Sequence, residues 1–434
     1  MPKVLQLELM SVDLPFRRAF RHAAAARNSS ESLFLKCVTD AGAVGFGESL
    51  PREYVTGETR DRAFALLERL ILPELIGMEF GSMEGVYEFL RTCDGKAPAE
   101  WVASDAPQCA AWCAVDLALL DAFGRTFNEP VRVAPRTAPP QVFRYSAVTS
   151  ADAGFKFIVS LLKLRGYGFK DVKLKVKKRD VLRCARIARR VMGRKTELRV
   201  DANMSWNVTE AIEAIRGLEN AGVRCVEQPL DANDLEGLAK LVEETNAEIF
   251  ADESFSDRES FSRLLEHKAC TGINVRISKC GGLVAAARRC EDALSAGLTL
   301  QIGCQVGESS LLSAAQLILI SAAPHAKYFE GCYGEHLLRD DPVSPCLQLR
   351  YGGRPPKWTG GFGLGVEVDE TKLNQWVKKR ALVEWRVGTR KKGNSHVASR
   401  KTDVFADRFH HGQRVRKTVP ESTRGAGKTA APHS

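Results

Sequence analysis

Residues 172–176 read Val-Lys-Leu-Lys-Val and begin a series of short apolar runs, which continues with ELRVD at 197–201, CVE at 225–227, IFAD at 249–252 and INVRISK at 273–279. Each run carries a charged residue at or near its C-terminal end: Lys175, Asp201, Glu227, Asp252 and Lys279, at intervals of 26, 26, 25 and 27 residues. One strand, one returning helix and their loops need about that length, so the spacing predicts one charged group per βα unit of a parallel barrel. Catalytic groups of such barrels lie at the C-terminal ends of the strands.

The flanking sequence extends the same alternation of strands and helices over the region 141–330. We expect eight strand ends, near Ala147, Lys175, Asp201, Glu227, Asp252, Lys279, Gly303 and Glu330. The segments between them have helical periodicity, as in 181–193 and 208–222, and several end in glycine. Neither GxGxxG after a strand nor GxxxxGK[ST] is present, so a nucleotide-phosphate site is not indicated. The pattern predicts an α/β fold, a (β/α)7β TIM-like barrel.

The segments outside the barrel are predicted to form a capping domain and a tail. Residues 1–130 combine three expected strands, at 4–12, 31–39 and 45–48, with helical spacing over 58–91 and 105–124, which predicts an α+β cap. A Pro-rich connector, APRTAPPQ, leads into the barrel. Residues 331–383 are expected to return to the cap, and residues 384–434 to form a basic, disordered tail.

The amino-acid composition indicates the cellular compartment and excludes some classes of binding partner. The net charge of +10 lies almost entirely in the tail, since residues 386–434 hold twelve Lys/Arg and three Asp/Glu, which is +9 and leaves about +1 for the rest. We therefore expect no nucleic-acid partner for the folded part. The N-terminus has no apolar h-region, so we expect no signal peptide, and Leu311–Ala323, the most apolar helical stretch, is too short to cross a membrane. Twelve scattered cysteines without zinc or disulfide spacing indicate a reducing, cytoplasmic location.

The acidic residues predict a metal site. Asp201, Glu227 and Asp252 come from three successive strands and should converge at the barrel mouth, where bare carboxylates need a cation to neutralise them. An all-oxygen set without histidine or cysteine suits Mg²⁺, with Mn²⁺ as a substitute, better than zinc. Glu253 competes with Asp252 for the ligand role, and strand phase favours Asp252.

The lysines predict acid–base chemistry beside that metal. Lys173 and Lys175 are two residues apart and point to the same side of a strand, while Lys279 should arrive from across the barrel. Burial and mutual repulsion are expected to lower a lysine pKa toward neutrality. A lysine on one face could then remove a proton α to a carboxylate while the cation stabilises the enolate, and the second lysine could return the proton or stabilise the intermediate by charge.

These residues belong to motifs that resemble a known family, namely Lys173-x-Lys175, Asp201-x-Asn203, Glu227-Gln228-Pro229, Ala251-Asp252-Glu253-Ser254, Lys279-Cys280-Gly281-Gly282, Gly47-Glu48-Ser49 and AVDLALLDAFGR. Over residues 1–383 the chain resembles the enolase superfamily, in its muconate lactonizing enzyme (muconate cycloisomerase) subgroup, which is related to mandelate racemase. The resemblance implies Asp201, Glu227 and Asp252 as Mg²⁺ ligands and Lys175 with Lys279 as the acid/base pair. It implies that Lys173 tunes Lys175.

The resemblance also guides the expected substrate contacts, which are Asn203, Glu308, Glu330 and Tyr54, with the loops 16–22 and 52–59 choosing the substrate. Asn203 could alternatively cap the following helix. The sequence differs from two related groups of the superfamily at the positions that carry their characteristic residues. The places that carry His and Asp in mandelate racemase-like members read GCQVGES and ISKCGG. The Asp-x-Asp of dipeptide epimerases is replaced by Phe329-Glu330-Gly331-Cys332, which has a single acid.

The sequence therefore predicts an Mg²⁺-dependent isomerase, a muconate cycloisomerase-like enzyme or an epimerase/racemase acting on a small carboxylate substrate. A lyase with the same parts (a dehydratase or an o-succinylbenzoate synthase-like enzyme) and a non-catalytic barrel with a basic interaction tail are the alternatives. We expect a homo-oligomer. Substrate identity, and which lysine is base and which is acid, stay open.

Overall fold

The computed structural model describes residues 1–21, 26–103, 105–133, 142–151, 154–176, 180–323 and 325–385. Residues 1–385 form one compact unit, and residues 386–434 are grouped separately and lie outside the described residues. The predicted disordered tail lies outside them as well, apart from Glu384 and Trp385. We keep the division of the first unit into a cap, 1–130, and a barrel, 141–330, as a proposal.

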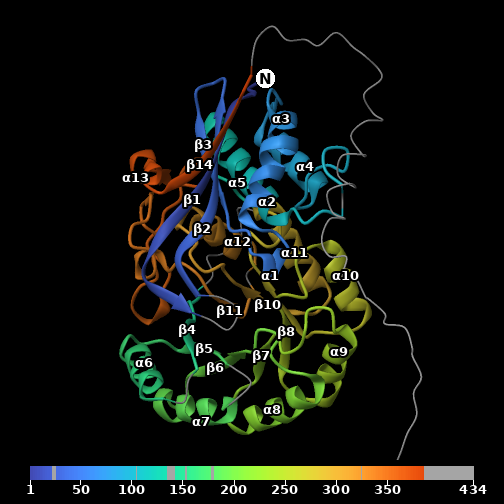
Figure 1. Cartoon of the computed structure of the whole chain (residues 1–434), viewed down its shortest axis with the longest axis vertical. Coiled ribbons are helices and arrows are strands. Elements are labelled where there is room, and N and C mark those ends of the chain that lie inside the picture. Colours follow the sequence, from blue (N-terminus) through green and yellow to red (C-terminus); the bar gives the residue numbers. More distant parts are fainter. Residues whose placement is uncertain are drawn as a thin grey trace, which may run out of the picture. The chain divides into compact units, whose positions relative to one another are not determined.

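The barrel consists of eight parallel strands that alternate with seven helices, and the helices α6 to α9 cover the outer face of the strands in Figure 1. In chain order the elements are β4 (Ala147–Ser150), α6 (Phe155–Gly166), β5 (Asp171–Lys175), α7 (Val181–Met192), β6 (Glu197–Asp201), α8 (Val208–Asn220), β7 (Cys225–Glu227), α9 (Leu235–Glu244), β8 (Glu248–Ala251), α10 (Arg258–Glu266), β9 (Gly272–Val275), α11 (Leu283–Ser295), β10 (Thr299–Ile302), α12 (Ser310–Ala322) and β11 (Tyr328–Phe329).

The strands pair in sequence order from β4 to β11, which is the order of a TIM-like barrel. The two ends of the sheet meet where the Ser146 amide, just before β4, donates to the Phe329 carbonyl in β11 at 2.7 Å. The sheet therefore curls into a barrel, and the predicted fold class is confirmed. Because the strands are parallel and covered outside by helices, their C-terminal ends form one rim.

Local sequence explains where the barrel helices begin. Asn207 caps α8 by accepting from the Glu210 amide, and the Glu210 side chain returns a bond to the Asn207 amide, which makes a capping box. Asp234 and Asp257 are the N-cap residues of α9 and α10, and their side chains accept hydrogen bonds from backbone amides of the first helical turn. Such caps fix the loops that leave the strand ends, and the catalytic groups of a barrel lie on those loops.

The cap is built on a four-stranded antiparallel sheet with the order β14-β1-β2-β3. Its strands are β1 (Val4–Arg21), β2 (Ala26–Thr39), β3 (Val44–Ser49) and β14 (Val377–Glu384). The helical elements of its N-terminal part are α1 (Glu53–Thr56), α2 (Arg60–Leu66), the π-helical turn η1 (Leu67–Ile71), α3 (Leu72–Leu75), α4 (Met83–Cys93) and α5 (Cys109–Thr126). The C-terminal segment holds η2 (Gly334–His336), β12 (Val343–Ser344), η3 (Tyr351–Gly353), β13 (Glu367–Val368) and α13 (Glu370–Asn374) before β14.

Helix α5 lies against the cap sheet and is buried along most of its length. A Cβ on Gly47 would lie 2.0 Å from the Ala114 carbonyl oxygen, so the strand and the helix approach too closely for any side chain. Two acids inside the helix bind backbone amides of distant segments. Asp116 accepts from Leu283 at the start of α11, and Asp121 accepts from Phe46 in β3. The same helix therefore orders both the cap sheet and a barrel helix.

A buried carboxyl group joins the cap to the barrel. Glu48, in β3, accepts hydrogen bonds from the Ser309 amide at 3.1 Å and from the Ser309 hydroxyl at 2.6 Å, at the N-terminus of α12. Burial raises the pKa of Glu48 from its usual 4.5 to about 8, against the opposing effect of the Ser309 hydrogen bonds. Burial likewise raises the pKa of Asp116 to about 7. These groups therefore take part in the pH dependence of folding.

We expect the Glu48→Gln variant to flatten the pH dependence of stability. Between about pH 4.5 and 8 the folded chain keeps the Glu48 proton that the unfolded chain has released, so the free energy of unfolding falls as pH rises. One such proton contributes a slope of up to about 1.4 kcal/mol per pH unit. Urea unfolding at pH 5, 6.5 and 8 measures this slope. Glu84→Gln, at an exposed pair with Arg91, is the control and should leave it unchanged, whereas equal slopes for E48Q and wild type would contradict the assignment.

Three details of the sequence prediction need correction. Strand β1 continues to Arg21, so the described part of the expected substrate loop 16–22 is a strand, and His22 lies outside the described residues. The helical region expected over 58–91 is broken into several short elements. The expected strand end at Lys279 is wrong, because β9 ends at Val275, four residues earlier.

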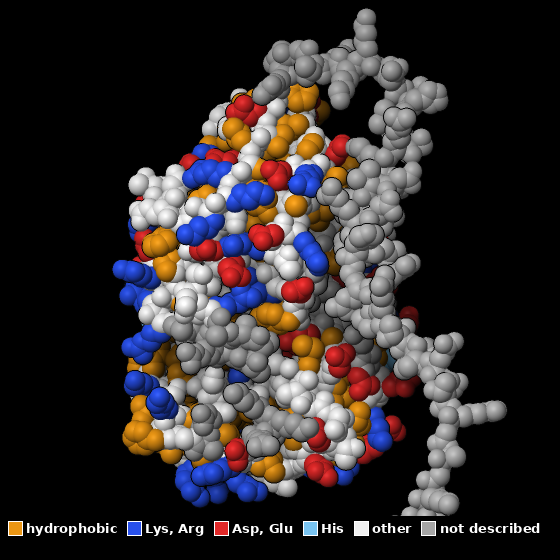
Figure 2. All heavy atoms as spheres, in the orientation of Figure 1, with side chains coloured by type: hydrophobic (Ala, Val, Ile, Leu, Met, Phe, Trp, Pro, Cys, Tyr) orange, Lys and Arg blue, Asp and Glu red, His pale blue; other side chains and the backbone are white. Residues whose placement is uncertain are grey.

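The surface agrees with the low charge expected for the residues before the tail. On the face shown in Figure 2, basic and acidic side chains are interspersed over the described residues without a large patch of one sign. Within the described part of the chain, no helix combines the length and the apolar character that a membrane crossing requires.

Candidate active site

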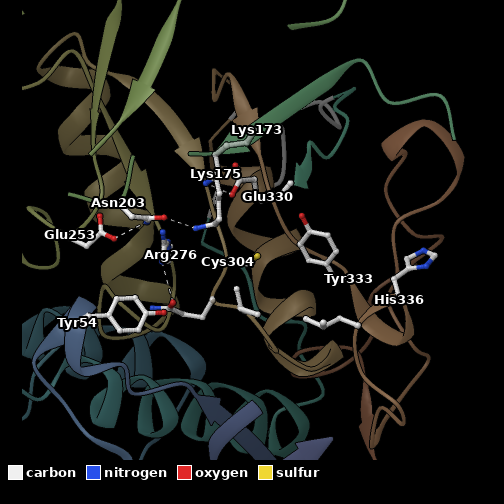
Figure 3. Close-up of a pocket in the computed structure, with 14 residues that line it drawn as sticks. Tyr54, Lys173, Lys175, Asn203, Glu253, Arg276, Cys304, Glu330, Tyr333 and His336 are labelled. Carbon is white, nitrogen blue, oxygen red and sulfur yellow. Dashed lines mark hydrogen bonds and ion pairs between the residues drawn. The ribbon is translucent and has the colours of Figure 1, made fainter. Parts of the chain in front are cut away.

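A pocket opens at the C-terminal rim of the barrel strands, with a cavity of about 190 Å³. Figure 3 shows side chains from the barrel, the cap and the C-terminal segment around it. Its lining residues are Tyr54, Val148, Lys173, Lys175, Asn203, Glu253, Arg276, Cys304, Gln305, Val306, Glu330, Tyr333, His336 and Leu337. Three cations at the rim and apolar groups on the other walls suit an organic anion.

Lys173 and Lys175 both face this pocket, because alternate residues of β5 point to the same side of the sheet. Lys173 is 2% exposed, and its ammonium group lies 3.1 Å from Glu227 and 2.7 Å from Glu330. Lys175 lies nearer the opening and donates to Asp201 at 3.0 Å and to Asn203 at 3.2 Å. Lys173 is therefore fixed by buried acids, and Lys175 is the more accessible amine.

The expectation of a lowered lysine pKa is wrong in sign for these ion pairs. Burial lowers the pKa of Lys175, but the attraction and hydrogen bond of Asp201 outweigh burial and the repulsion of Lys173, so the pKa lies above its usual value. Burial also lowers the pKa of Lys173, but the attraction of Glu227 and Glu330 outweighs burial, so this pKa is raised as well. The like charge two residues away is visible in the sequence, whereas the acids on the neighbouring strands come close to the lysines only in the folded barrel.

The three predicted metal ligands lie beside one another at the rim. The parallel register pairs Lys175 with Asp201 and Asp201 with Glu227, and Asp252 follows directly after β8. All three carboxylates are buried. Burial alone would raise the pKa of Glu227, but Lys173 and Arg276 lower it below the usual value. Lysine and arginine side chains therefore form ion pairs with all three acids.

Protein cations and amides bind these carboxylates directly. Asp201 accepts from Lys175 and from the Asn203 amide, and Asp252 accepts from Lys279 and Arg276. Among the described residues, no three His, Cys, Asp or Glu side chains are arranged so that they could hold a metal ion as they stand. The donor set is nevertheless all oxygen and comes from three adjacent strand ends, which suits Mg²⁺ in kind.

The structure places Arg276, and not Lys279, at the pocket wall. Arg276 is the first residue after β9 and lines the pocket. Lys279 lies in the following turn with no exposed surface, and its ammonium group donates to the Asp252 carbonyl at 2.8 Å, the Asp252 carboxylate at 2.9 Å and the Asn274 carbonyl at 2.8 Å. All three of its protons are thus used inside the protein. The position assigned to Lys279 from the sequence is corrected accordingly.

Three of the four predicted substrate contacts line the pocket, namely Asn203, Tyr54 and Glu330. Asn203 accepts from Lys175 and donates to Glu253 at 3.3 Å, and this row of side chains is visible in Figure 3. It does not cap α8, because Asn207 does. Tyr54 comes from α1 of the cap, within the predicted loop 52–59.

The two acidic residues among the predicted contacts, Glu330 and Glu308, are bound within the protein. Glu330 lines the pocket, but it is already bound by Lys173 and, at 3.1 Å, by Arg199. Glu308 accepts from the Gln305 amide at 2.6 Å and lines a separate small cavity beside the main pocket. Burial raises the pKa of Glu308 to about 8. Neither carboxylate stands free at the pocket wall.

Sequence reasoning missed Arg276, Tyr333 and His336, which line the pocket, and it considered Glu253 only as a rival ligand. Arg276 had a usable signal, because it follows the apolar run 273–275 just as Asp252 follows 249–251. Tyr333 and His336 come from the segment after the barrel. This segment does not follow the 26-residue repeat, so the sequence pattern does not predict that it lies at the rim.

Comparison with known proteins identifies the family. A family model described as "Enolase C-terminal domain-like" matches residues 158–372. L-Ala-D/L-Glu epimerase of Clostridium acetobutylicum is 30% identical over 314 residues, which cover 70% of this chain and 84% of that protein. The chain belongs to the enolase superfamily. Muconate cycloisomerase 1 of Rhodococcus opacus is 26% identical and is covered over 98% of its length, with 86% of this chain.

Solved structures share the fold of this chain. A crystal structure of dipeptide epimerase from Cytophaga hutchinsonii, complexed with Mg and dipeptide D-Ala-L-Val, superposes with a TM-score of 0.77 at 22% identity. The match covers 88% of this enolase-superfamily chain and all of that structure, and at this identity it concerns the fold alone. The curated relatives carry the names of epimerases, racemases and cycloisomerases, and the chain is accordingly an isomerase of the superfamily.

Proposed function

We propose that this enzyme removes a proton from the carbon α to the carboxylate of a small organic acid, with Lys175 as the base. The observation that carries this proposal is the placement of Lys175 beside Asp201 at the open end of the barrel, on the wall of a pocket lined by three cations. The amine is within reach of a molecule in the pocket, and Lys173 behind it is committed to buried acids. Relatives named as epimerases and cycloisomerases support this chemical class.

Asp201, Glu227 and Asp252 would hold the Mg²⁺ ion, supported by their donor type and their adjacent strand ends. When bound, the ion supplies positive charge that stabilises an enolate dianion. Lys175 shares Asp201 with that site, so its role as a base requires that the Asp201 charge be drawn away from it. Asn203 accepts from Lys175 and thereby holds the amine in place.

The remaining lining groups position the organic part of the substrate. Tyr54 comes from the cap, and Tyr333 and His336 come from the segment after the barrel. Glu330 is neutralised by Lys173 and Arg199, so it is committed within the protein rather than offered to a substrate ammonium group. This arrangement supports carboxylates without a free amine beside the reacting carbon, such as N-acylamino acids or muconates.

A deuterium-exchange panel tests the proposed function. The full-length chain is incubated in D₂O and MgCl₂ with dipeptides, N-acylamino acids, muconates and sugar acids, and ¹H NMR follows the α-hydrogen. We expect exchange or conversion of at least one carboxylate, dependent on MgCl₂. Conversion with loss of water or another β-substituent would instead identify a lyase. A chain truncated at about Glu384 that keeps its turnover and loses no nucleic-acid binding would remove the scaffold alternative.

The metal site has a separate test that needs no substrate. We expect Asp201→Asn to weaken Mg²⁺ binding by at least about 10-fold, because one of three anionic ligands is lost. Isothermal titration of the purified protein with MgCl₂ measures this change. Asp231→Asn, at an exposed loop after β7, is the matched control and should bind like wild type. Equal Mg²⁺ affinity of D201N and wild type would remove Asp201 from the site.

A further inference from the structure

The pocket has a lysine on one wall and an arginine on the opposite one. Lys175 ends β5, the second of the eight barrel strands, and Arg276 follows β9, the sixth. Strands four places apart in a closed eight-stranded barrel face each other across its axis. A flat, planar reacting carbon held between these walls therefore presents one face to Lys175 and the other to Arg276.

Arg276 is held firmly in this place by polar neighbours. One terminal nitrogen donates to Gln305 at 3.2 Å, and the other binds Asp252 and lies 3.7 Å from Glu227. Its Nε is buried and has no hydrogen-bond partner among the described residues. A buried donor without a partner is costly, and an anionic oxygen of a bound substrate would satisfy it.

Lysine and arginine differ in the chemistry that they can perform here. A neutral lysine amine accepts a proton and returns it, whereas a guanidinium group stays protonated in proteins and has no acceptor. Arg276 can therefore bind an oxygen and balance developing negative charge, but it cannot remove a proton. Inversion at the α-carbon needs a proton donor and acceptor on both faces, and the one lysine that could have served the second face, Lys279, is enclosed behind the wall.

We propose, on the basis of the function above, that this enzyme moves the α-proton on the Lys175 face alone, with Arg276 as an electrostatic partner that binds the substrate's oxyanion. The C–H bond breaks, its electron pair enters the enolate, and the proton forms an N–H bond on Lys175. The enolate then either takes a proton back from Lys175 and re-forms the C–H bond on the same face, or its electron pair forms a double bond to the β-carbon. In the second case a substituent leaves the β-carbon with the electron pair of its own bond to that carbon. Cycloisomerisation, elimination and exchange with retention fit this scheme, and epimerisation does not.

A carboxylate with two hydrogens on its α-carbon tests this inference. N-succinylglycine and muconolactone are incubated separately with the enzyme in D₂O and MgCl₂, and mass spectrometry counts the incorporated deuterium. Exchange on one face stops at one deuterium in a single configuration, and exchange on both faces continues to two. We expect wild type to stop at one. A second deuterium entering within about tenfold of the rate of the first would overturn the inference and leave the proposed function standing. Absence of deuterium from both probes, together with absence of exchange or conversion across the carboxylate panel above, would overturn the proposed function and the inference with it.

Variants of Arg276 sharpen the result. R276K places an amine on the second face and should add the second deuterium, whereas R276M should slow the first exchange by about 10²-fold and still stop at one. R289K is the matched control, since Arg289 is also a buried arginine and pairs with Asp94 and Asp292 outside the pocket. An R276K protein that is folded by circular dichroism and still stops at one deuterium would contradict the assignment of Arg276 to the second face. If R276K does not fold, the numbers of deuterium atoms incorporated by wild type and by R276M test the inference.

Discussion

Replacing Lys175 with alanine is expected to reduce turnover by about 10²–10⁴-fold, the range that a positioned general base contributes. Lys175 is the pocket amine nearest the opening, and Lys173 cannot replace it because Glu227 and Glu330 hold its ammonium group within 3.1 Å and 2.7 Å. The rate of α-hydrogen exchange in D₂O is the direct measure, since it reports proton transfer without requiring product formation.

The same variant should leave the fold intact. Lys175 contacts the polar side chains of Asp201 and Asn203 at the rim, and its loss opens no apolar cavity. The control is Lys170→Ala, at an exposed lysine just before β5, which should retain wild-type exchange. Wild-type exchange by K175A with normal far-UV circular dichroism would show that another group removes the proton.

The architecture was accessible from the sequence because a barrel repeats one unit. The period near 26 residues located β5, β6 and β7, whose ends are Lys175, Asp201 and Glu227 as expected. The two-residue alternation in β5 placed Lys173 and Lys175 on the same side. These inferences depend only on local geometry, which short-range sequence patterns carry.

The chemistry of the second face was not accessible in the same way. In the run 273–279 the sequence offered Arg276 and Lys279, and the period alone favoured Lys279. The choice depends on where β9 ends, which is set by pairing with β8 and β10 rather than by the residues of the run. Likewise, the raised pKa of Lys175 depends on Asp201 from the neighbouring strand, a contact that exists only once the barrel closes.

The corrected position of Lys279 leads to the second large effect, which is on stability. We expect Lys279→Met to lower the free energy of unfolding by about 3–5 kcal/mol, the cost of breaking a buried pair by removing one partner. The change would leave the Asp252 and Asn274 carbonyls and one Asp252 oxygen without this donor inside the protein. Urea unfolding of the purified chain measures the loss.

Lys240→Met separates this effect from the general loss of a lysine. Lys240 pairs with Glu244 at 3.6 Å on the surface of α9 and is 56% exposed, so its removal should cost no more than about 1 kcal/mol. The same substitution is thus made at a buried lysine, Lys279, and at an exposed lysine, Lys240, so a difference in the free energy of unfolding reports the effect of burial. If K279M kept the wild-type free energy of unfolding but lost α-hydrogen exchange by 10²-fold or more, Lys279 would act on the substrate after all. Two amines would then serve the pocket, and the one-face scheme built on Arg276 would fail with it.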